Sequence, residues 1–461
     1  MSRLLPFPSS DPVDAALAPL LEAARFTGAP GQIVLVQQDD GPVALVGVGA
    51  RAELTAARVR TAFAAAGRAL GHLPEVVVDL GTIADGPLPR PALDRAAAEG
   101  LVLGGYAFRK HRSAAAGVAT EWVPVEPSEA WREGLEIARQ VTLVRDVVNE
   151  PGNVMTPAAL TDHLVALAAE HGLTAVVRDA AWLADQGAGG IIAIGQGSAQ
   201  HPRMVELVHK GAGGDVDLCL VGKGVTYDTG GLSLKSPDQL ISMNSDMAGV
   251  AVIAHAMTFL RHVAPSLHVR AFLPIVENMP GPDAIRPGDV VTARNGKTIE
   301  ILNTDFEGRT ILADALSFAS ERKPSLLIDV ATLTYGATVA LGPRMGALLG
   351  NDDGVPFVER AAASSGEPMW RLPMQDWMQP TIESRIADVK NFPYQPSARA
   401  ITAAMFLREF VAPGLPWAHL DIAGPSWAFE QQELSGEGAT GFGMRLLVDL
   451  FSDLAARTEP R

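Results

Sequence analysis

The chain has a single cysteine, Cys219, and therefore cannot form an internal disulfide. Cys219 lies in the apolar run DLCLVG, where a buried thiol is far more common than a nucleophile. No uninterrupted apolar run is long enough to span a bilayer, and the first residues, MSRLLPFPSSDP, lack the apolar core of a signal peptide. We therefore expect a cytoplasmic protein without a membrane partner.

Positive charge is in deficit, because 37 lysines and arginines stand against 52 aspartates and glutamates, giving a net charge of -15. A nucleic-acid partner is disfavoured, since phosphate binding needs clustered Lys and Arg. The sequence contains no G-x-x-x-x-G-K-[ST], which excludes a nucleotide-binding P-loop. None of the ten histidines belongs to an H-E-x-x-H pattern, which excludes the zinc-binding helix of the zincins.

The length of 461 residues is typical of two or three domains. Strand and helix patterns alternate near the start and predict a smaller N-terminal α/β domain over residues 1–125. A Pro-punctuated segment then leads into the helical run EAWREGLEIARQVTLVRDVVN, so we expect a connecting helix within 126–150. Residues 151–461 are the predicted catalytic domain. The N-terminal elements are expected at 31–38, 42–49, 53–70 and 75–81.

The second domain again alternates short apolar runs with helical patterns, such as 246–263 and 308–322. Strands separated by helices indicate an α/β fold with a mostly parallel, helix-covered mixed sheet. Binding sites in such sheets lie outside the carboxyl ends of the strands. One segment differs, because DVVTARNGKTIEIL predicts a hairpin around Asn295-Gly296. The expected sheet strands are 190–197, 204–210, 216–222, 267–277, 325–333 and 417–424.

The stretch VGKGVTYDTGGLSLKS leaves one of these strands with charged residues set among glycines. Lys223, Asp228 and Lys235 are either scattered charges on a solvated turn or groups that converge on one charged ligand. Taken singly, Lys223 is most often a turn lysine and Asp228 a turn residue before Gly-Gly. Ser233 and Lys235 also permit a nucleophile and base pair, so a Ser-Lys amidase stays open as an alternative.

A second acidic pair, Asp305 and Glu307, follows the predicted hairpin and precedes a helix. If residues 305–307 are extended, both carboxylates lie on one face, where they repel unless a cation lies between them. With Asp228 and Asp246 they make four carboxylates, a set suited to two divalent ions roughly 3.5–4 Å apart. Alternatively, Asp305 caps the helix and Glu307 interacts with its positive end.

The motif NTDFEGR, residues 303–309, and the motif GKGVTYDTGG, residues 222–231, closely resemble the signatures of the leucyl aminopeptidase (cytosol aminopeptidase) family of dinuclear metallopeptidases. Further segments that resemble the family extend from Arg145 to Arg445, among them RDVVNEPGNVMTP, VENMPGPDAIRPGDVV, AITAAMFLREF and PWAHLDIAG. The N-terminal third is similar to the family only in its general α/β character.

This resemblance implies an enzyme that hydrolyses the N-terminal residue from peptides with a water activated by two metal ions. It implies that Asp228 and Glu307 bridge the ions, and that Asp305 serves the exchangeable one. Mn or Zn is the expected metal, and the family's assembly implies a homohexamer. The implied metal ligands are Lys223, Asp228, Asp246, Asp305 and Glu307. The implied catalytic residues are Lys235 and Arg309, with Arg309 also holding a bicarbonate, and the expected substrate pocket includes Met243, Asn303, Thr332 and Leu333.

The chain departs from the family at four positions, which leaves the preferred N-terminal residue open. Phe306 replaces a small residue between two ligands, and we expect its ring to pack behind the site if the stretch is extended, or to enter the pocket if the stretch bends. Asn244, Tyr335 and Arg399 are the other departures. A catalytically altered family member with a structural or DNA-binding role remains an alternative, although the ligand set, Lys235 and Arg309 are intact.

Overall fold

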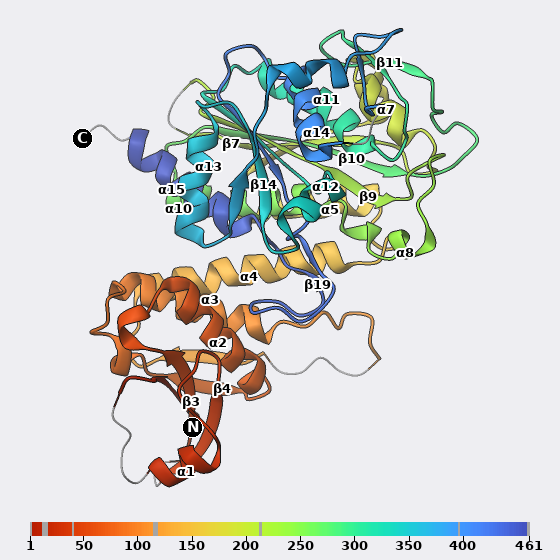
Figure 1. Cartoon of the computed structure of the whole chain (residues 1–461). Helices are drawn as coiled ribbons and strands as arrows, with labels where there is room; N and C mark the ends of the chain where they lie inside the picture. Colours follow the sequence, from red (N-terminus) through yellow and green to blue (C-terminus); the bar gives the residue numbers. More distant parts are fainter. Residues whose placement is uncertain are drawn as a thin grey trace. The chain divides into compact units, whose positions relative to one another are not determined.

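The computed structural model describes residues 2–11, 17–38, 41–113, 119–211, 214–394 and 397–458. Contacts within the chain define two compact units (Figure 1). The first comprises Met1–Arg145 with Ala428–Thr440, and the second comprises Asp146–Trp427 with Gly441–Arg461. The helix expected within 126–150 is α4, Glu129–Asn149. Residues 428–440 belong by their contacts to the first unit, whereas the sequence analysis did not separate them from the C-terminal part.

The first unit is built on a five-stranded sheet in the order β2-β3-β1-β4-β5. β2 and β3 lie at the two ranges expected for strands and form an antiparallel pair, and the other neighbours are parallel. The strands are β1 (Ser2–Pro8), β2 (Ile33–Gln38), β3 (Gly41–Gly49), β4 (Glu75–Val78) and β5 (Glu121–Pro124). The helices before α4 are α1 (Ala18–Ala23), α2 (Ala56–Leu70) and α3 (Arg90–Gly105).

Helices α2 and α3 pack with their backbones in close contact, because small residues line both. A Cβ added at Gly104 would lie 2.0 Å from the carbonyl oxygen of Ala64, and one at Gly100 would lie 2.4 Å from that of Arg60. The alanines and glycines of these helices therefore serve helix packing, which explains why so alanine-rich a segment forms a stable layer on the sheet.

The second unit contains a mixed, mostly parallel sheet in the order β15-β14-β17-β13-β8-β10-β7-β6, with β9 beside β10. Strands β17, β13, β8 and β10 form its parallel centre, and antiparallel pairs flank them. This confirms the predicted fold class. The strands are β6 (Thr174–Arg178), β7 (Arg203–His209), β8 (Leu218–Gly222), β9 (Gly224–Asp228), β10 (Val269–Asn278), β13 (Leu326–Ala331), β14 (Gly346–Gly350), β15 (Met369–Arg371) and β17 (Trp417–Asp421).

The helices of this unit cover both faces of the sheet (Figure 1). They are α5 (Pro157–His171), α6 (Ala180–Asp185), α7 (Gly189–Gly195), α8 (Pro237–Leu240), α9 (Ala248–Met257), α10 (Leu260–Val263), α11 (Glu307–Ser320), α12 (Tyr335–Leu341), α13 (Val355–Ser365), α14 (Arg399–Arg408) and α15 (Met444–Thr458). None of the described helices is long and apolar enough to cross a membrane.

The two faces of strand β8 contact the two helix layers that cover the sheet. Cys219 and Val221 lie in the core cluster that includes α7, α11 and α14, while Leu218 and Leu220 do not. Successive side chains of a strand point to opposite faces, so the second pair faces the α9 side. Cys219 is fully buried, as expected, and burial raises the pKa of its thiol to about 12.

The predicted hairpin is present, with β11 (Val290–Thr292) antiparallel to β12 (Thr298–Glu300) and Gly296 at φ +87 between them. On its other side β12 pairs in parallel with β16 (Val389–Lys390), which completes a small sheet. The remaining short strands, β18 (Trp427–Ala428) and β19 (Gly438–Ala439), lie at the ends of the segment that returns to the first unit.

The prediction of a strand at 190–197 is wrong, because residues 190–195 belong to helix α7 and the next two form a turn. Oδ2 of Asp314, on α11, accepts the N–H of Ile191 at 2.8 Å. This hydrogen bond provides an acceptor for one of the N–H groups in the first turn of α7. Gly190 lies so close to α11 that an added Cβ would be 2.4 Å from the Thr310 carbonyl oxygen. A short apolar run is compatible with a buried helix or a strand, and here a distant carboxylate selects the helix.

We predict that Asp314→Ala lowers the free energy of unfolding by about 2–4 kcal/mol, because the buried N–H of Ile191 and the part-buried N–H of Arg294 both lose their acceptor. Glu321→Ala is the matched control, since it removes only a part-exposed ion pair to Arg294, worth about 0–1 kcal/mol. Urea unfolding of both variants measures the difference. Equal losses would contradict the structural role of Asp314.

Candidate metal centre

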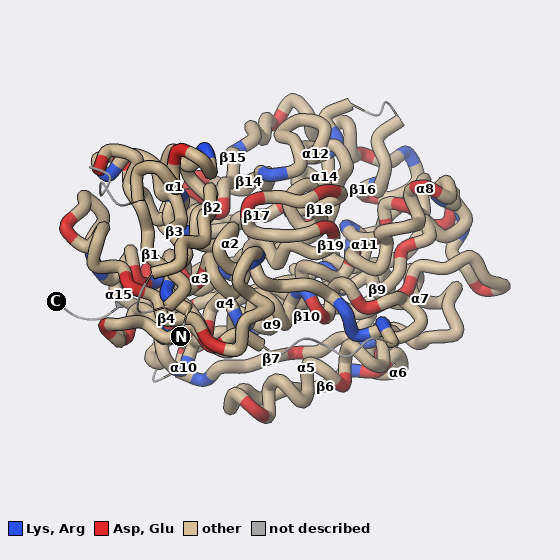
Figure 2. The backbone as a smooth tube through the Cα atoms, turned by 90° about the horizontal axis from the view of Figure 1, so that it is seen from below, with Lys and Arg blue, Asp and Glu red and all other residues tan. Residues whose placement is uncertain are grey.

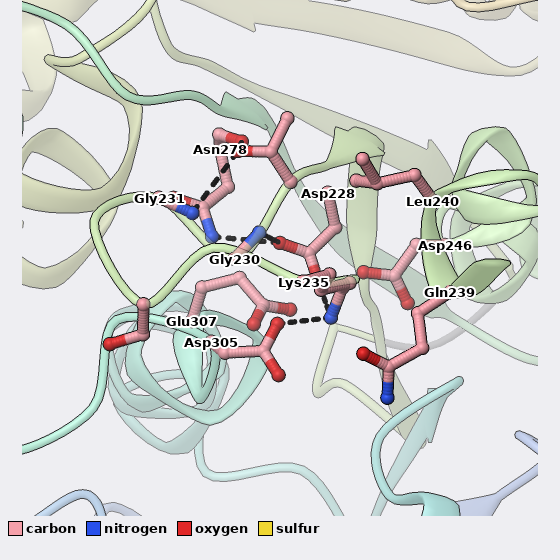
Figure 3. Close-up of polar contacts among 12 residues, drawn as sticks. Asp228, Gly230, Gly231, Lys235, Gln239, Leu240, Asp246, Asn278, Asp305 and Glu307 are labelled. Carbon is pink, nitrogen blue, oxygen red and sulfur yellow. Dashed lines mark hydrogen bonds and ion pairs between the residues drawn. The ribbon is translucent and has the colours of Figure 1, made fainter. Parts of the chain in front are cut away.

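The charged residues of the two sequence motifs converge at the carboxyl ends of the central strands (Figure 3). Lys223 lies between β8 and β9, and Asp228 is the last residue of β9. Asp246 follows the short 3-10 helix η3, Met243–Ser245. Glu307 begins α11, and Asp305 lies in the turn just before it. The site is therefore at the edge of the sheet where the topology predicts it.

Two glycine positions allow this convergence. Gly230 has φ +84, and a Cβ there would lie 2.9 Å from Asp305 Oδ1. A Cβ at Gly308 would lie 2.5 Å from Cε of Lys223, so only glycine lets the first turn of α11 approach that lysine.

The acidic groups lie within reach of one cation. Ligand oxygens of Asp228, Asp305 and Glu307 all lie within 4.8 Å of one another. Lys223 Nζ lies 2.7 Å from Asp246 Oδ1 and 2.8 Å from Glu307 Oε1. Lys235 Nζ lies 2.7 Å from Asp228 Oδ2 and contacts Asp305 directly. Two ammonium groups thus face four carboxylates, which leaves an excess of negative charge.

Burial and mutual repulsion dominate the electrostatics. Burial raises the pKa of Asp228 and Asp246, and it raises the pKa of Asp305 to about 7 with the help of Asp228. Burial acts in the same direction on Glu307, but Lys223 and Lys235 outweigh it, so its pKa is lowered. The site therefore needs positive charge to hold all its carboxylates ionised near neutral pH.

One carboxylate oxygen of the site lacks a hydrogen-bond partner. Asp246 Oδ1 accepts hydrogen bonds from Lys223 and from the hydroxyl of Thr332 at 2.7 Å. Asp246 Oδ2 is buried and has no hydrogen-bond partner among the described residues. A buried carboxylate oxygen without a donor is costly. Oxygen donors with excess charge are the ligands that divalent cations prefer, so these residues fit a metal site.

Arg309 is buried in the first turn of α11, and its Nε and Nη1 have no hydrogen-bond partner within the described part of the chain. Burial lowers the pKa of its guanidinium to about 9. The Phe306 ring lies 4.5 Å from the guanidinium carbon in a cation–π contact. Phe306 also packs edge-on against Phe392, with ring centroids 4.7 Å apart. The free N–H groups of Arg309 suit a small anion.

Residues 305–307 are bent, so the condition under which both carboxylates would lie on one face of an extended stretch is not met. Asn303 Oδ1 accepts the N–H of Asp305 at 2.8 Å, and its carbonyl accepts the N–H of Phe306 at 3.3 Å, which makes a turn. α11 then begins at Glu307 without a side-chain cap, so Asp305 does not cap it. Asp305 and Glu307 come together because a turn runs into a helix. Phe306 is only partly buried, and the premise for packing it behind the site fails.

The other residues predicted near the site occupy varied positions. The carbonyl of Thr332 accepts a hydrogen bond from Lys223 at 2.9 Å, and the N–H of Leu333 donates to Asp421 Oδ1 at 3.1 Å. Met243 is partly buried in η3, and the Asn303 side chain supports the turn described above. Their role in a substrate pocket stays a prediction.

The remaining departures from the family pattern differ in their surroundings. Asn244 donates to the carbonyls of Val148 and Glu150. Tyr335 begins α12 and Arg399 begins α14, and both side chains are exposed.

Ser233 and Lys235 have separate partners. Ser233 Oγ accepts the N–H of Thr304 at 3.2 Å, whereas Lys235 Nζ is held by Asp228 and Asp305. The geometry does not favour the Ser-Lys alternative, since a base must lie within hydrogen-bond reach of its nucleophile.

Two polar residues at the site were not predicted from the sequence. Asn278 donates to Asp228, and Asp421 accepts the N–H groups of Leu333 and Thr334. Both lie at strand ends in segments that resemble the family, VENMPG and HLDIAG, but spacing alone gave no sign of their partners.

Comparison with known proteins identifies the fold and the activity class. The pattern of the cytosol aminopeptidase family's catalytic domain matches residues 142–448, and that of its N-terminal domain matches residues 9–115. The chain belongs to the cytosol aminopeptidase family. It is therefore a hydrolase of the leucyl aminopeptidase type that acts on peptides, in a family that depends on metal. The resemblance noted in the sequence is confirmed.

Full-length relatives support this membership. The probable cytosol aminopeptidase of Syntrophotalea carbinolica is 38% identical over 455 residues, 94% of this chain and 91% of the relative. That of Mycobacterium ulcerans is 39% identical and covers 98% and 89%. Among solved structures, the bottromycin maturation enzyme BotP in complex with Mn has a TM-score of 0.93 at 39% identity, covering 98% and 99%. The cytosol aminopeptidase from Coxiella burnetii has a TM-score of 0.87 at 30% identity, covering 98% and 96%.

We predict that Phe306→Ala lowers the free energy of unfolding by about 1–3 kcal/mol, because a partly buried ring loses its contacts with Phe392 and Arg309. Phe429→Ala is the control at a highly exposed aromatic position, with an expected change within about 0.5 kcal/mol. Thermal melts of both variants test this. A Phe306→Ala protein as stable as the control would show that these ring contacts contribute nothing.

Proposed function

We propose that the protein is a metalloaminopeptidase that binds two divalent ions and removes the N-terminal residue from peptides with a free amino terminus. The observation that carries the proposal is the convergence of Asp228, Asp305 and Glu307, joined through Lys223 to Asp246, whose buried Oδ2 has no hydrogen-bond partner among the described residues. In this proposal Asp228 and Glu307 would be shared between the ions, Asp305 would hold the exchangeable one, and Lys223 and Asp246 would hold the tighter one. When bound, the ions would polarise the first peptide carbonyl and lower the pKa of a water between them.

The protein groups around the site have separate tasks. Lys223 can act as a ligand only as the neutral amine, and a neighbouring dication favours that form by lowering the pKa that Asp246 and Glu307 now raise. The Nζ of Lys235 lies between Asp228 and Asp305 at the proposed metal site. It would stabilise the negative charge that develops on the substrate oxygen. The unpartnered N–H groups of Arg309 would hold a bicarbonate, which would supply a group able to accept a proton.

Manganese or zinc is the proposed metal. A set rich in carboxylates accepts both, and the solved relative in complex with Mn supports manganese. Met243, Asn303, Thr332 and Leu333 are proposed to line the substrate pocket.

A cytoplasmic location and a homohexamer are also proposed. Family resemblance supports the hexamer, and the relatives named as cytosol aminopeptidases support the location. The charge distribution supports the absence of a nucleic-acid partner, because basic and acidic positions are intermixed along the chain in the view of Figure 2 and the net charge is -15. A structural role without catalysis is less well supported, because every proposed ligand lies within the cluster.

We predict that dialysis against a strong chelator abolishes hydrolysis of aminoacyl amides, and that Mn²⁺, Co²⁺ or Zn²⁺ restores it. The reason is that no protein group at the site replaces the water activation that the ions supply. Elemental analysis must accompany the assay. Full activity in a sample shown to be free of metal would overturn the proposal.

We predict that Lys235→Ala keeps both ions but lowers kcat about 100- to 1000-fold, because it removes a group that acts on the transition state. Asp305→Ala should lose metal as well as activity. Lys297→Ala is the matched control, since Lys297 forms a surface pair with Glu409. Metal content and kcat are measured for all three. If Lys235→Ala lost metal while Asp305→Ala retained it, the roles given to these residues would be wrong.

A further inference from the structure

The side chain of Asn278 lies beside Asp228 (Figure 3) and contacts both of the segments that carry the carboxylates. Asn278 ends β10 and is 2% exposed. Its Nδ2 donates to Asp228 Oδ1 at 2.7 Å and to the carbonyl oxygen of Thr304 at 3.0 Å. Thr304 immediately precedes Asp305 in the turn that leads to Glu307. One amide group therefore links the carboxylate at the end of β9 to the segment that supplies the other two.

The position of this amide is itself fixed. Asn278 and Asp228 are partners across β10 and β9, and the Asn278 carbonyl accepts the N–H and the hydroxyl of Thr229 at 3.0 and 2.8 Å. The amide oxygen lies against Gly231, where an added Cβ would be 2.9 Å away. Gly231 has φ +62 and leaves room that no other residue would leave. The amide is thus held by both strands and by the Gly-Gly turn.

The contact limits how the Asp228 carboxylate can turn. Oδ1 accepts from Asn278 and from the N–H of Gly230 at 2.9 Å, while Oδ2 faces Lys235 at 2.7 Å. A carboxylate held by donors on one side presents its remaining lone pairs in a defined direction. Rotation of Asp228 would break two hydrogen bonds in a buried place, which is costly.

The same amide also fixes the opposite segment. The Thr304 hydroxyl donates to the Gly230 carbonyl at 2.6 Å, and the N–H of Ser233 donates to the Thr304 hydroxyl at 2.8 Å. These contacts hold Thr304 to the Gly-Gly turn, and Asn278 holds its carbonyl to Asp228. The spacing between Asp228 and the pair Asp305 and Glu307 is therefore set by a closed ring of hydrogen bonds.

We propose that Asn278 is a positioning residue of the metal site: it binds neither metal nor substrate, and it sets the orientation of Asp228 relative to Asp305 and Glu307. The inference rests on the proposed two-ion function. A neutral group with two N–H donors on one atom is needed here, because aspartate would add a fifth negative charge and a hydroxyl would satisfy only one acceptor. Loss of such a supporting hydrogen bond typically weakens metal binding about 10- to 100-fold.

Asn391 offers a matched control within the same region. It is fully buried, its Oδ1 accepts the N–H groups of Leu302 and Asn303, and its Nδ2 donates to the Asn303 carbonyl at 2.7 Å. It therefore supports the same turn, but within the described part of the chain it forms no hydrogen bond with a ligand carboxylate. Comparison of the two asparagines separates support of the turn from orientation of Asp228.

The test is a titration of metal-free protein with Mn²⁺, with free Mn²⁺ followed by its paramagnetic resonance signal, for wild type, Asn278→Leu and Asn391→Leu. Leucine has the same branched skeleton as asparagine, with two larger methyl groups in place of the amide oxygen and nitrogen, and it donates no hydrogen bond. We expect two ions in the wild type, at least tenfold weaker binding of one of them in Asn278→Leu, and binding within about threefold of wild type in Asn391→Leu. If circular dichroism shows Asn278→Leu to be unfolded, Asn278→Ser replaces it with the same expectation.

Wild-type affinity for both ions in the Asn278 variant would overturn the inference, and so would an equal loss in both variants. A wild-type protein that binds fewer than two ions would instead overturn the proposed function, and with it the role of Asn278. The first failure is seen in the variants and the second in the wild-type protein, so the two are distinguishable.

Discussion

The rest of the site depends on repulsion among four carboxylates held at the end of one sheet. Asp228, Asp246, Asp305 and Glu307 are brought together by the ends of β9 and η3 and by the turn before α11. Their burial raises the cost of charge, and Lys223 and Lys235 offset only part of it. Clustered, buried carboxylates destabilise the fold, and a cation bound among them would offset that cost. The glycines at 230 and 308 and the amide of Asn278 are consequences of this constraint, since each lets the charged groups approach or holds them in place.

Local patterns predicted the elements whose geometry is local. The Asn295-Gly296 hairpin formed as expected because its turn is local, closed between Ala293 and Lys297 with Gly296 in the left-handed region. Strand β8 formed because its apolar run is buried on both faces. The prediction failed where a distant group decides. Residues 190–195 became part of α7 because Asp314, more than a hundred residues away, accepts an N–H of its first turn. The partners of Asn278 and Asp421 were beyond prediction for the same reason. Residues 305–307 are a different case, because the side chain of Asn303, only two residues from Asp305, closes a turn that the pattern of charges did not indicate.

Family membership and physical reasoning support different parts of the account. Membership gives the aminopeptidase class and the fold. The geometry adds what is particular to this chain. Phe306 stands where the family has a small residue, and its ring covers the Arg309 guanidinium and contacts Phe392. The larger side chain therefore contacts the arginine that is proposed to hold an anion. The N-terminal unit has its own sheet and core, and nothing in the proposed chemistry draws on its residues.

The most direct test of the central claim is a crystal structure of the manganese-loaded protein, with anomalous difference maps recorded on both sides of the manganese absorption edge. The account predicts two strong peaks roughly 3.5–4 Å apart, one in contact with Asp246 and the other with Asp305, with Asp228 and Glu307 touching both. A single peak, or peaks away from these carboxylates in a protein that hydrolyses aminoacyl amides, would contradict it.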